Sequence, residues 1–203
     1  MRDLSVIVPV YKNEASIPDL LRALAALDGK LNGRLEVVFV VDGSPDRCHE
    51  LLLAQLPDQP FAAKLVLLSR NFGAFAAVRM GLMHAAGSLF AVMAADLQEP
   101  PELIVQMFSV LSGGACDVVV GVRAARSDPL LQRWTARFFW SAYRRWVVPQ
   151  MPAGGVDIFA CNQSFRDALL ALEESRSSLI AQIFWLGFRR AEVPYERQIR
   201  QHG

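Results

Sequence analysis

The chain has 203 residues, 53% of them hydrophobic, and a formal net charge of +1 at pH 7. This length suits one domain with a substantial core, and the near-neutral charge argues against a nucleic-acid-binding protein that relies on bulk positive charge. Three widely spaced cysteines, Cys48, Cys116 and Cys161, form no CxxC pair, so we expect free thiols in a reducing compartment. The sequence contains no apolar run of about 18 residues, as a membrane span requires, and from its first residues we expect a strand rather than a signal peptide.

Apolar runs alternate with helical patterns over the first 122 residues. The runs predict short buried strands at residues 4–10, 35–41, 63–68, 89–94 and 117–122. Periodic or Ala-rich segments between them predict helices at residues 16–27, 47–56, 72–86 and 100–112. This alternation predicts a three-layer α/β/α sandwich with a mostly parallel sheet and helices on both faces.

The pattern changes after residue 122, where residues 123–150 are basic and aromatic. This stretch suits a helix at an anionic membrane surface, and equally a helix packed on the sheet with solvated arginines. Further strands are expected at 156–160 and 190–193, and further helices at 162–173 and 177–186. The polar end shows no stop signal, so we expect a longer natural protein.

Polar side chains follow four successive predicted strands. They are Tyr11 and Glu14, then Asp42, then Asn71, and finally Asp96 with Gln98. Ligands bind at the carboxyl ends of strands in an open parallel sheet, so we expect these groups to form one polar site. Taken singly, Asp42 also suits an ordinary turn and Asp96 a helix cap.

Neither a dinucleotide GxGxxG motif nor a GxxxxGK[ST] P-loop is present. The phosphates of a nucleotide would therefore need another partner, and a divalent cation held by Asp96 is the simplest one.

Several motifs in order resemble glycosyltransferase family 2. They are VPVYKNE, VVDGSPD, LSRNFGAFAA, AADLQEPPEL, VVVGVR, GGVDIFACN and IFWLGFRRAEVPYERQIR. More narrowly, they are similar to the polyprenyl-phosphate glycosyltransferases, which include dolichol-phosphate mannose synthase and bacterial undecaprenyl-phosphate sugar transferases. The resemblance extends over essentially the whole chain.

This resemblance implies a GT-A (Rossmann-like) fold in a single catalytic domain over residues 1–203. Residues 1–122 would bind a UDP- or GDP-linked sugar, and residues 123–203 would bind a polyprenyl (undecaprenyl) phosphate acceptor. The implied reaction is inverting and assisted by Mg²⁺ or Mn²⁺. Membrane helices after residue 203, a location on the cytoplasmic face of the inner membrane, and a homo-oligomer are compatible with it, whereas nucleic acid is not an expected partner.

The family pattern also assigns roles to residues. On the donor side it implies Pro9, Tyr11, Glu14, Asp42, Asn71, Gly73, Asp96 and Gln98. Asp96 and Gln98 would hold the metal, with Asp96 counted as catalytic together with Asp157, the carboxylate near the acceptor. Arg123 would meet the acceptor phosphate, with Arg126, Arg133 and Arg137 as helpers.

Two positions depart from the family pattern. Val41 stands where an Asp-Asp-Gly-Ser sequence would begin, and Ala94 stands at the first position of the usual Asp-x-Asp metal motif. Loss of a carboxylate at Ala94 should weaken the cation site without abolishing it, because magnesium commonly binds through one or two carboxylates plus substrate phosphates.

Three other functions stay open from the sequence. A family 2 enzyme acting on a glycan or protein hydroxyl could use Asp157 as its base. A degenerate, non-catalytic domain could bind a nucleotide or a partner. A nucleotidyltransferase on a related sandwich is a weaker alternative, since the Gly-rich loop expected near its first strand is missing.

Overall fold

The computed structural model describes residues 2–123, 156–173 and 178–198. The strands are β1 (Leu4–Val10), β2 (Leu35–Val41), β3 (Ala62–Leu67), β4 (Leu89–Val92), β5 (Val118–Arg123), β6 (Val156–Asn162) and β7 (Arg190–Tyr195). The α-helices are α1 (Ile17–Lys30), α2 (Cys48–Gln55), α3 (Ala74–His84), α4 (Pro101–Ser112), α6 (Gln163–Ala171) and α7 (Leu179–Trp185). Every strand and helix predicted within the described residues is confirmed, and the largest shift of an end is in α1, which continues to Lys30.

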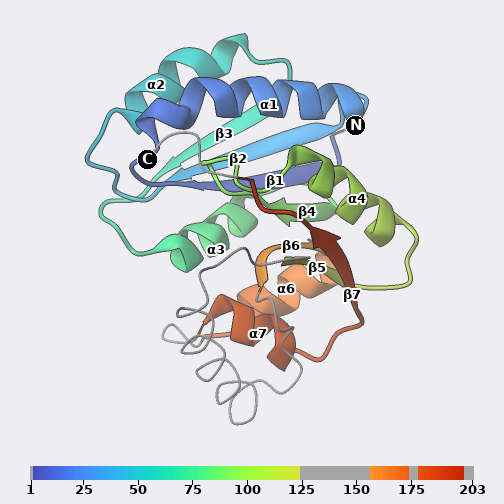
Figure 1. Ribbon diagram of the computed structural model, residues 1–203. Coiled ribbons are helices and arrows are strands. Elements are labelled where there is room, and N and C mark those ends of the chain that lie inside the picture. The colour runs from blue at the N-terminus through green and yellow to red at the C-terminus, as the bar shows by residue number, and fades with distance from the viewer. Residues whose placement is uncertain (1, 124–155, 174–177, 199–203) are drawn as a thin grey trace, which may run out of the picture.

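The strands form one seven-stranded sheet in the order β3-β2-β1-β4-β6-β5-β7 (Figure 1). Strand β6 runs antiparallel to its neighbours β4 and β5, whereas the other pairings are parallel. The mostly parallel sheet predicted from the sequence is therefore confirmed. All strands except β6 end at the same edge, which lies on the left in Figure 1.

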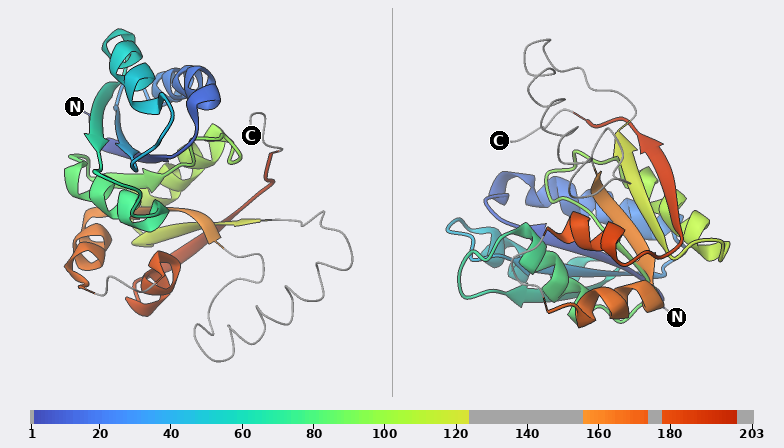
Figure 2. Two further views of the ribbon diagram at one scale, coloured as in Figure 1. Left: turned by 90° about the vertical axis from the view of Figure 1, so that its left-hand side faces the viewer. Right: turned by 90° about the horizontal axis from the view of Figure 1, so that it is seen from below.

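Helices cover both faces of the sheet, which gives the three-layer sandwich (Figures 1 and 2). Helices α1, α2 and α4 lie on one face, and α3, α6 and α7 lie on the other. Strand β2 is buried along its whole length, with Phe39 facing the first helix layer and Val40 facing the second. A β-branched run without polar alternation is what a strand covered on both faces requires.

Helix α3 lies very close to the sheet because Gly81 faces it. A Cβ at Gly81 would lie 2.3 Å from Cγ2 of Ile7 and 3.2 Å from Cγ2 of Val40. The absent side chain thus sets the distance between the helix and β1 and β2. This distance matters for the ligand site, since the first turn of α3 lies at the edge where these strands end.

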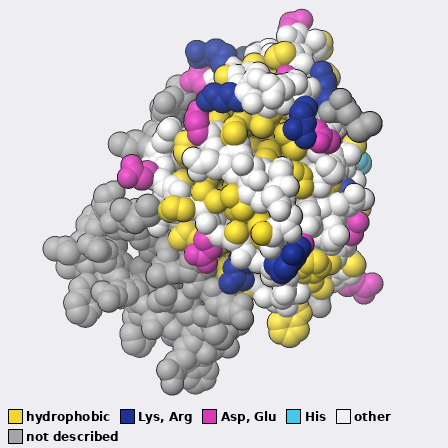
Figure 3. Space-filling model, turned by 90° about the vertical axis from the view of Figure 1, so that its right-hand side faces the viewer, with side chains coloured by type: hydrophobic (Ala, Val, Ile, Leu, Met, Phe, Trp, Pro, Cys, Tyr) yellow, Lys and Arg dark blue, Asp and Glu magenta, His cyan; other side chains and the backbone are white. Residues whose placement is uncertain are grey.

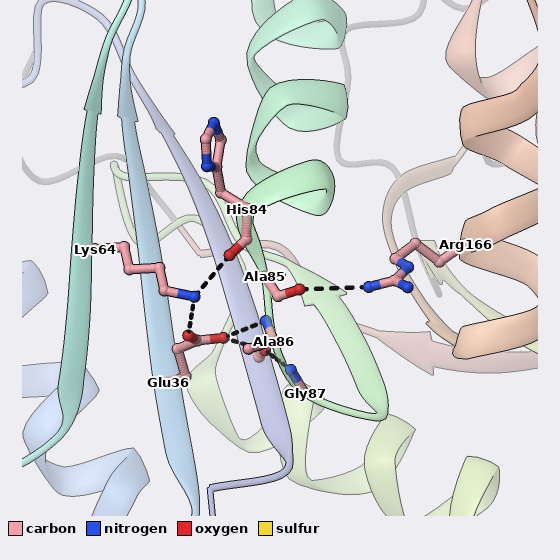
Figure 4. A network of polar contacts seen from close by, with 8 residues as sticks. Glu36, Lys64, His84, Ala85, Ala86, Gly87 and Arg166 are labelled. Carbon is pink, nitrogen blue, oxygen red and sulfur yellow. Dashed lines mark hydrogen bonds and ion pairs between the residues drawn. The ribbon is translucent and has the colours of Figure 1, made fainter.

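A buried polar network fixes the turn between α3 and β4 at the amino-terminal edge of the strands (Figure 4). The carboxylate of Glu36 accepts hydrogen bonds from Ser5 Oγ (2.6 Å) and from the backbone N–H of Ala86 (2.8 Å), and it pairs with Lys64 Nζ at 2.7 Å. Lys64 also donates to the carbonyl of His84 at the end of α3. Burial raises the pKa of Glu36, but these bonds outweigh it and the net pKa is lowered.

A second polar cluster joins the starts of β5 and β7 to the end of β6. The Nε and Nη2 atoms of Arg189 each donate to the Asp117 carboxylate at 2.9 Å, and Asn162 Nδ2 donates to it at 3.0 Å. The hydrogen bond from Arg189 is the main reason that the pKa of Asp117 falls to about 2. Both polar clusters lie away from the carboxyl edge, which leaves that edge to the ligand site.

Strand β7 forms one edge of the sheet, beside α4. Figure 3 shows the right-hand side of the molecule as seen in Figure 1, where hydrophobic side chains lie among interspersed acidic and basic ones. No helix within the described residues is long and apolar enough to cross a bilayer. Most of the basic aromatic stretch expected at a membrane surface lies outside the described residues, beyond the end of β5 at Arg123.

Replacing Gly81 by alanine should destabilise the fold. The added methyl must displace Ile7 or push α3 away from the sheet, and overpacking of this kind costs about 1–3 kcal/mol. Urea denaturation measures the change. The matched control is Gly29→Ala, also in a helix but with no atom within 4 Å of the new Cβ, which should be neutral or stabilising. Equal stability of the Gly81 variant and the parent would contradict the packing constraint.

Candidate functional site

A pocket of about 270 Å³ opens at the carboxyl edge of the sheet, the edge seen face-on in the left panel of Figure 2. Its walls come from the ends of β1, β2 and β4 and from the loop before α3. The lining residues are Pro9, Val10, Tyr11, Asn13, Asp42, Asn71, Gly73, Ala74, Ala94, Ala95 and Asp96. Six of the eight donor-side residues implied by the sequence are among them, since Glu14 and Gln98 are not.

Asp42 is held inside the wall of this pocket and is only 2% exposed. Its Oδ1 accepts the backbone N–H of Phe72 at 2.7 Å, and its Oδ2 accepts that of Gly73 at 2.8 Å. A buried carboxylate requires such donors. Asp42 therefore fixes the loop before α3, a role that the expectation of direct contact with a nucleoside did not include.

Gly43 allows the two loops to meet. Its φ is +57°, and a Cβ there would lie 2.3 Å from the backbone carbon of Arg70. Glycine tolerates both the left-handed backbone and the close approach. The Asp-Gly-Ser sequence is thus more than an ordinary turn, because it passes directly against the chain that carries Asn71.

The loop after β1 is fastened to the loop after β2. The backbone N–H of Lys12 donates to Ser44 Oγ at 2.7 Å, and Lys12 has a φ of +55°. Tyr11, next to it, lines the pocket and keeps 38% of its surface exposed. Glu14 does not line the pocket, and its Oε2 accepts the backbone N–H of Arg47 at 3.1 Å. Glu14 therefore braces the two loops in this structure.

Asp46 is a residue that the sequence reasoning did not single out. It accepts hydrogen bonds from Ser44 Oγ (2.6 Å), from the backbone N–H of Glu14 (3.1 Å) and from Cys48 Sγ (3.2 Å). Burial raises its pKa, but the bonds from Ser44 and its neighbours lower it overall. Asp46 follows Ser44 and Pro45 just before helix α2, and this position in the sequence could have identified it as a residue that fixes the loop.

The three cysteines are free and buried, as expected from their spacing. Cys48 lies beneath the pocket loops, where burial and the adjacent Asp46 carboxylate raise the pKa of its thiol to about 12. A thiol held protonated in this way is a poor nucleophile.

Asp96 follows β4 and brings a carboxylate to the pocket beside Ala94 and Ala95. The next residue, Leu97, has a φ of +56°, and the N–H of Gln98 donates to Asp96 Oδ1 at 3.3 Å. The Gln98 side chain is directed to the end of the described chain, where its Oε1 accepts a hydrogen bond from Arg197. The assignment of Gln98 and Asp96 as metal ligands stays a prediction.

The donor set at Asp96 fits a hard divalent cation only in part. The Asp96 carboxylate is the kind of oxygen ligand that Mg²⁺ or Mn²⁺ prefers, whereas Gln98 Oε1 is engaged by Arg197 and Ala94 offers a methyl group. Within the described residues, no group of three or more histidine, cysteine or acidic side chains gathers that could hold a metal ion. A cation here would need further oxygens from a ligand, as magnesium takes from substrate phosphates.

The predicted acceptor residues are described only in part. Arg123 is the last residue of β5, half-buried and opposite Tyr195 of β7. Asp157 lies in β6, where the pairing with β5 shifts register; its side chain lies outside the described part, as do Arg126, Arg133 and Arg137. Arg123 thus lies on the same edge of the sheet as Asp96.

Comparison with known proteins agrees with this geometry. The family model described as glycosyl transferase family 2 matches residues 5–170. An undecaprenyl-phosphate 4-deoxy-4-formamido-L-arabinose transferase of Pseudomonas aeruginosa is 38% identical over 202 residues, which is 98% of this chain and 59% of that protein. The chain therefore spans less than two thirds of that relative.

Solved structures share the fold at lower identity. The mannosyltransferase PcManGT from Pyrobaculum calidifontis, in complex with GDP-Man and Mn²⁺, superposes with a TM-score of 0.68 at 20% identity, over 95% of this chain and 55% of that one. Glucosyl-3-phosphoglycerate synthase from Mycobacterium tuberculosis, in complex with Mn²⁺, UDP and glucosyl-3-phosphoglycerate, superposes with a TM-score of 0.65 at 18% identity, over 100% of this chain and 73% of that one.

The fold is that of the GT-A glycosyltransferases, with a polar pocket at the carboxyl edge of its sheet. The chain belongs to glycosyl transferase family 2.

Replacing Asp42 by asparagine should weaken both the fold and the pocket. The new amide group turns a donor toward the N–H of Phe72 or Gly73, and a lost bond to a buried group costs about 1–3 kcal/mol. Urea denaturation measures the loss, and calorimetry with UDP and GDP should show weaker binding. Asp58→Asn, an exposed acid at the end of a 3-10 turn, is the control. An unchanged free energy of unfolding for the Asp42 variant would refute the anchoring role.

Proposed function

We propose that this chain is the catalytic domain of an enzyme that transfers a sugar from a UDP- or GDP-linked donor to a polyprenyl phosphate. The observation that carries the proposal is the pocket itself, in which Tyr11, Asp42, Asn71 and Asp96 meet from four separate loops. The name of the Pseudomonas aeruginosa relative supports undecaprenyl phosphate as the acceptor. Residues 1–122 would bind the donor and residues 123–203 the acceptor.

The donor nucleoside would lie between the loops after β1 and β2. Tyr11 offers a half-exposed ring against which a base can stack, and Pro9 adds a rigid apolar surface beside it. Asn71 offers an amide to the base or ribose, while Asp42 keeps the wall in place. The diphosphate would then extend toward Asp96.

Asp96 would hold Mg²⁺ or Mn²⁺ together with the donor diphosphate and the amide oxygen of Gln98. When bound, the cation would neutralise charge on the leaving nucleoside diphosphate. The protein prepares this position through the turn at Leu97 and the hydrogen bond from the N–H of Gln98 to Asp96. Both orient the carboxylate before the donor arrives.

The acceptor phosphate would approach along the ends of β5 and β6. Its oxygen is ionised near neutral pH, so the reaction needs positioning and charge stabilisation more than a strong base. Arg123 would bind this phosphate, because a guanidinium matches phosphate oxygens in two-point contacts. Asp157 would orient the acceptor, and three further arginines would help Arg123 to bind the acceptor phosphate: Arg126, Arg133 and Arg137. This reaction would take place at the cytoplasmic surface of the membrane. Displacement in a single step inverts the anomeric carbon.

Replacing Asp96 by asparagine should lower transfer about 100-fold or more, the usual loss when one group that stabilises developing charge is removed. The assay follows radiolabelled sugar from a UDP- or GDP-sugar into undecaprenyl phosphate, separated by partition into butanol. Asp167→Asn, an exposed acid on α6, should retain full activity.

The same assay separates the alternatives. Label that stays in the aqueous phase on a glycan would point to a hydroxyl acceptor. Nucleotide binding without transfer or donor hydrolysis would indicate a non-catalytic domain. Near-normal transfer by the Asp96 variant would remove the metal assignment.

Replacing Arg123 by alanine should raise the KM for the lipid phosphate more than the KM for the nucleotide sugar, because the lost guanidinium binds the acceptor. Steady-state kinetics with each substrate varied in turn measure both constants. Arg123→Lys should recover part of the acceptor affinity, and Arg22→Ala, on the exposed side of α1, should change neither constant. Equal increases in both constants would count against an acceptor role.

A further inference from the structure

Two arginines cross between helices α3 and α6 in opposite directions. From the middle of α3, the guanidinium of Arg79 donates to three backbone carbonyls at the end of α6. They belong to Leu169 (2.8 Å), Leu170 (3.2 Å) and Leu172 (2.8 Å). From the first half of α6, Arg166 Nη1 donates to the carbonyl of Ala85 at 3.3 Å, just after the end of α3 (Figure 4). We call this pair, Arg79 and Arg166, the arginine clasp.

Each arginine of the clasp binds the carboxyl end of the other helix. The last carbonyls of an α-helix have no partner within that helix and carry the negative end of its dipole, so a cation there is stabilising. The start of α6 lies beside the end of α3, and the end of α6 lies beside the middle of α3, so the two helices run antiparallel. They cannot slide past one another without breaking these hydrogen bonds.

The two helices serve different parts of the proposed reaction. Helix α3 begins in the wall of the donor pocket, to which Gly73 and Ala74 contribute. Helix α6 follows β6 directly, and Asn162 caps it by accepting the backbone N–H of Phe165 at 2.9 Å. Because β6 runs antiparallel to β4, its start, which contains Asp157, lies at the edge where β4 ends. The clasp therefore links the donor pocket to the strand that carries the proposed acceptor carboxylate.

The sheet joins these two parts over a short pairing. Strand β4 pairs with β6 at three positions, Leu89, Phe90 and Ala91, which all precede the pocket residues that follow β4. On one face of the sheet α4 packs against β4, β5, β6 and β7. On the other face the clasp adds hydrogen bonds of fixed direction to the apolar contacts between α3 and α6.

The clasp also reaches strand β4. The guanidinium of Arg166 stacks on the ring of Phe90, with its carbon atom 4.6 Å from the ring centroid. Phe90 is fully buried in β4, the strand that leads to Asp96. A guanidinium is a planar group with five donors, so it can stack on a ring and bind several oxygens at once. Strand β4 and both helices are thus fastened together on this face.

We propose that Arg79, supported by Arg166, is a positioning residue that holds the donor pocket and strand β6 in the relative placement that sugar transfer requires. This inference rests on the proposed function. Transfer in one step needs the acceptor oxygen close to the anomeric carbon and in line with the bond that breaks, and a displacement of about 1 Å can slow a reaction about 100-fold. Neither arginine is among the described residues that line the donor pocket, so both act through the helices.

The test compares the full chain with its Arg79→Met variant, which keeps a long side chain but loses the donors. Calorimetry with UDP and GDP in Mn²⁺ gives the number of binding sites and their affinity, and the transfer assay with undecaprenyl phosphate gives kcat per titrated site. We expect unchanged nucleotide affinity, because Asp42 still fixes the pocket wall, and a kcat per site that falls about 10-fold through misalignment. Arg22→Met, on the exposed side of α1, should change neither quantity.

Two further variants test the same contacts. Arg79→Lys should give a kcat per site between those of the parent and Arg79→Met, because an ammonium group can bind some of the three carbonyls. Arg166→Met should lower kcat per site by a smaller factor, since it removes one hydrogen bond to a carbonyl. Added to Arg79→Met, it should cost less than it does alone, because the clasp is already open. These two variants carry the comparison if Arg79→Met fails to fold.

A purely structural role predicts a different result. Arg79→Met would then reduce the number of titrated sites and the total rate together and leave kcat per site at the parent value, which would overturn the proposal. A nucleotide affinity that falls by the same factor as kcat would also overturn it, since the pocket itself would be damaged. A parent that binds nucleotide but transfers no sugar to undecaprenyl phosphate would instead overturn the proposed function, an outcome seen before any variant is compared.

Discussion

The buried carboxylate of Asp42 is the contact on which the ligand site depends. Asp42 is only 2% exposed, so its carboxylate oxygens need hydrogen-bond donors from the protein. The backbone N–H groups of Phe72 and Gly73 provide these donors. This bond ties the end of β2 to the start of α3, and Gly43 removes the side chain that would keep them apart. The walls of the pocket therefore depend on the position of α3 relative to the end of β2.

The described lining of the pocket contains few acidic side chains. Val41 is fully buried at the end of β2 and contributes to the core, and Ala94 adds a methyl group to a pocket lining whose described carboxylates are Asp42 and Asp96.

The elements were predictable because their signals are local. Strand β2 is a β-branched run that only a doubly covered strand explains, and α1 repeats its apolar residues at helical spacing. The side chains of Glu14 and Gln98 were assigned to the pocket, but they bond to Arg47 and Arg197. These partners lie 33 and 99 residues away, so no local pattern reveals them.

The sequence by itself determined the alternation of strands and helices, the edge at which polar loops gather, and six of the eight donor-side residues that line the pocket there. Hydrophobic periodicity and turn chemistry act over a few neighbouring residues, which is why a sequence shows them. Only the tertiary structure decided what each carboxylate contacts. Asp42 is committed to backbone donors while Asp96 lines the pocket, since hydrogen bonding across the fold depends on where distant segments come to lie.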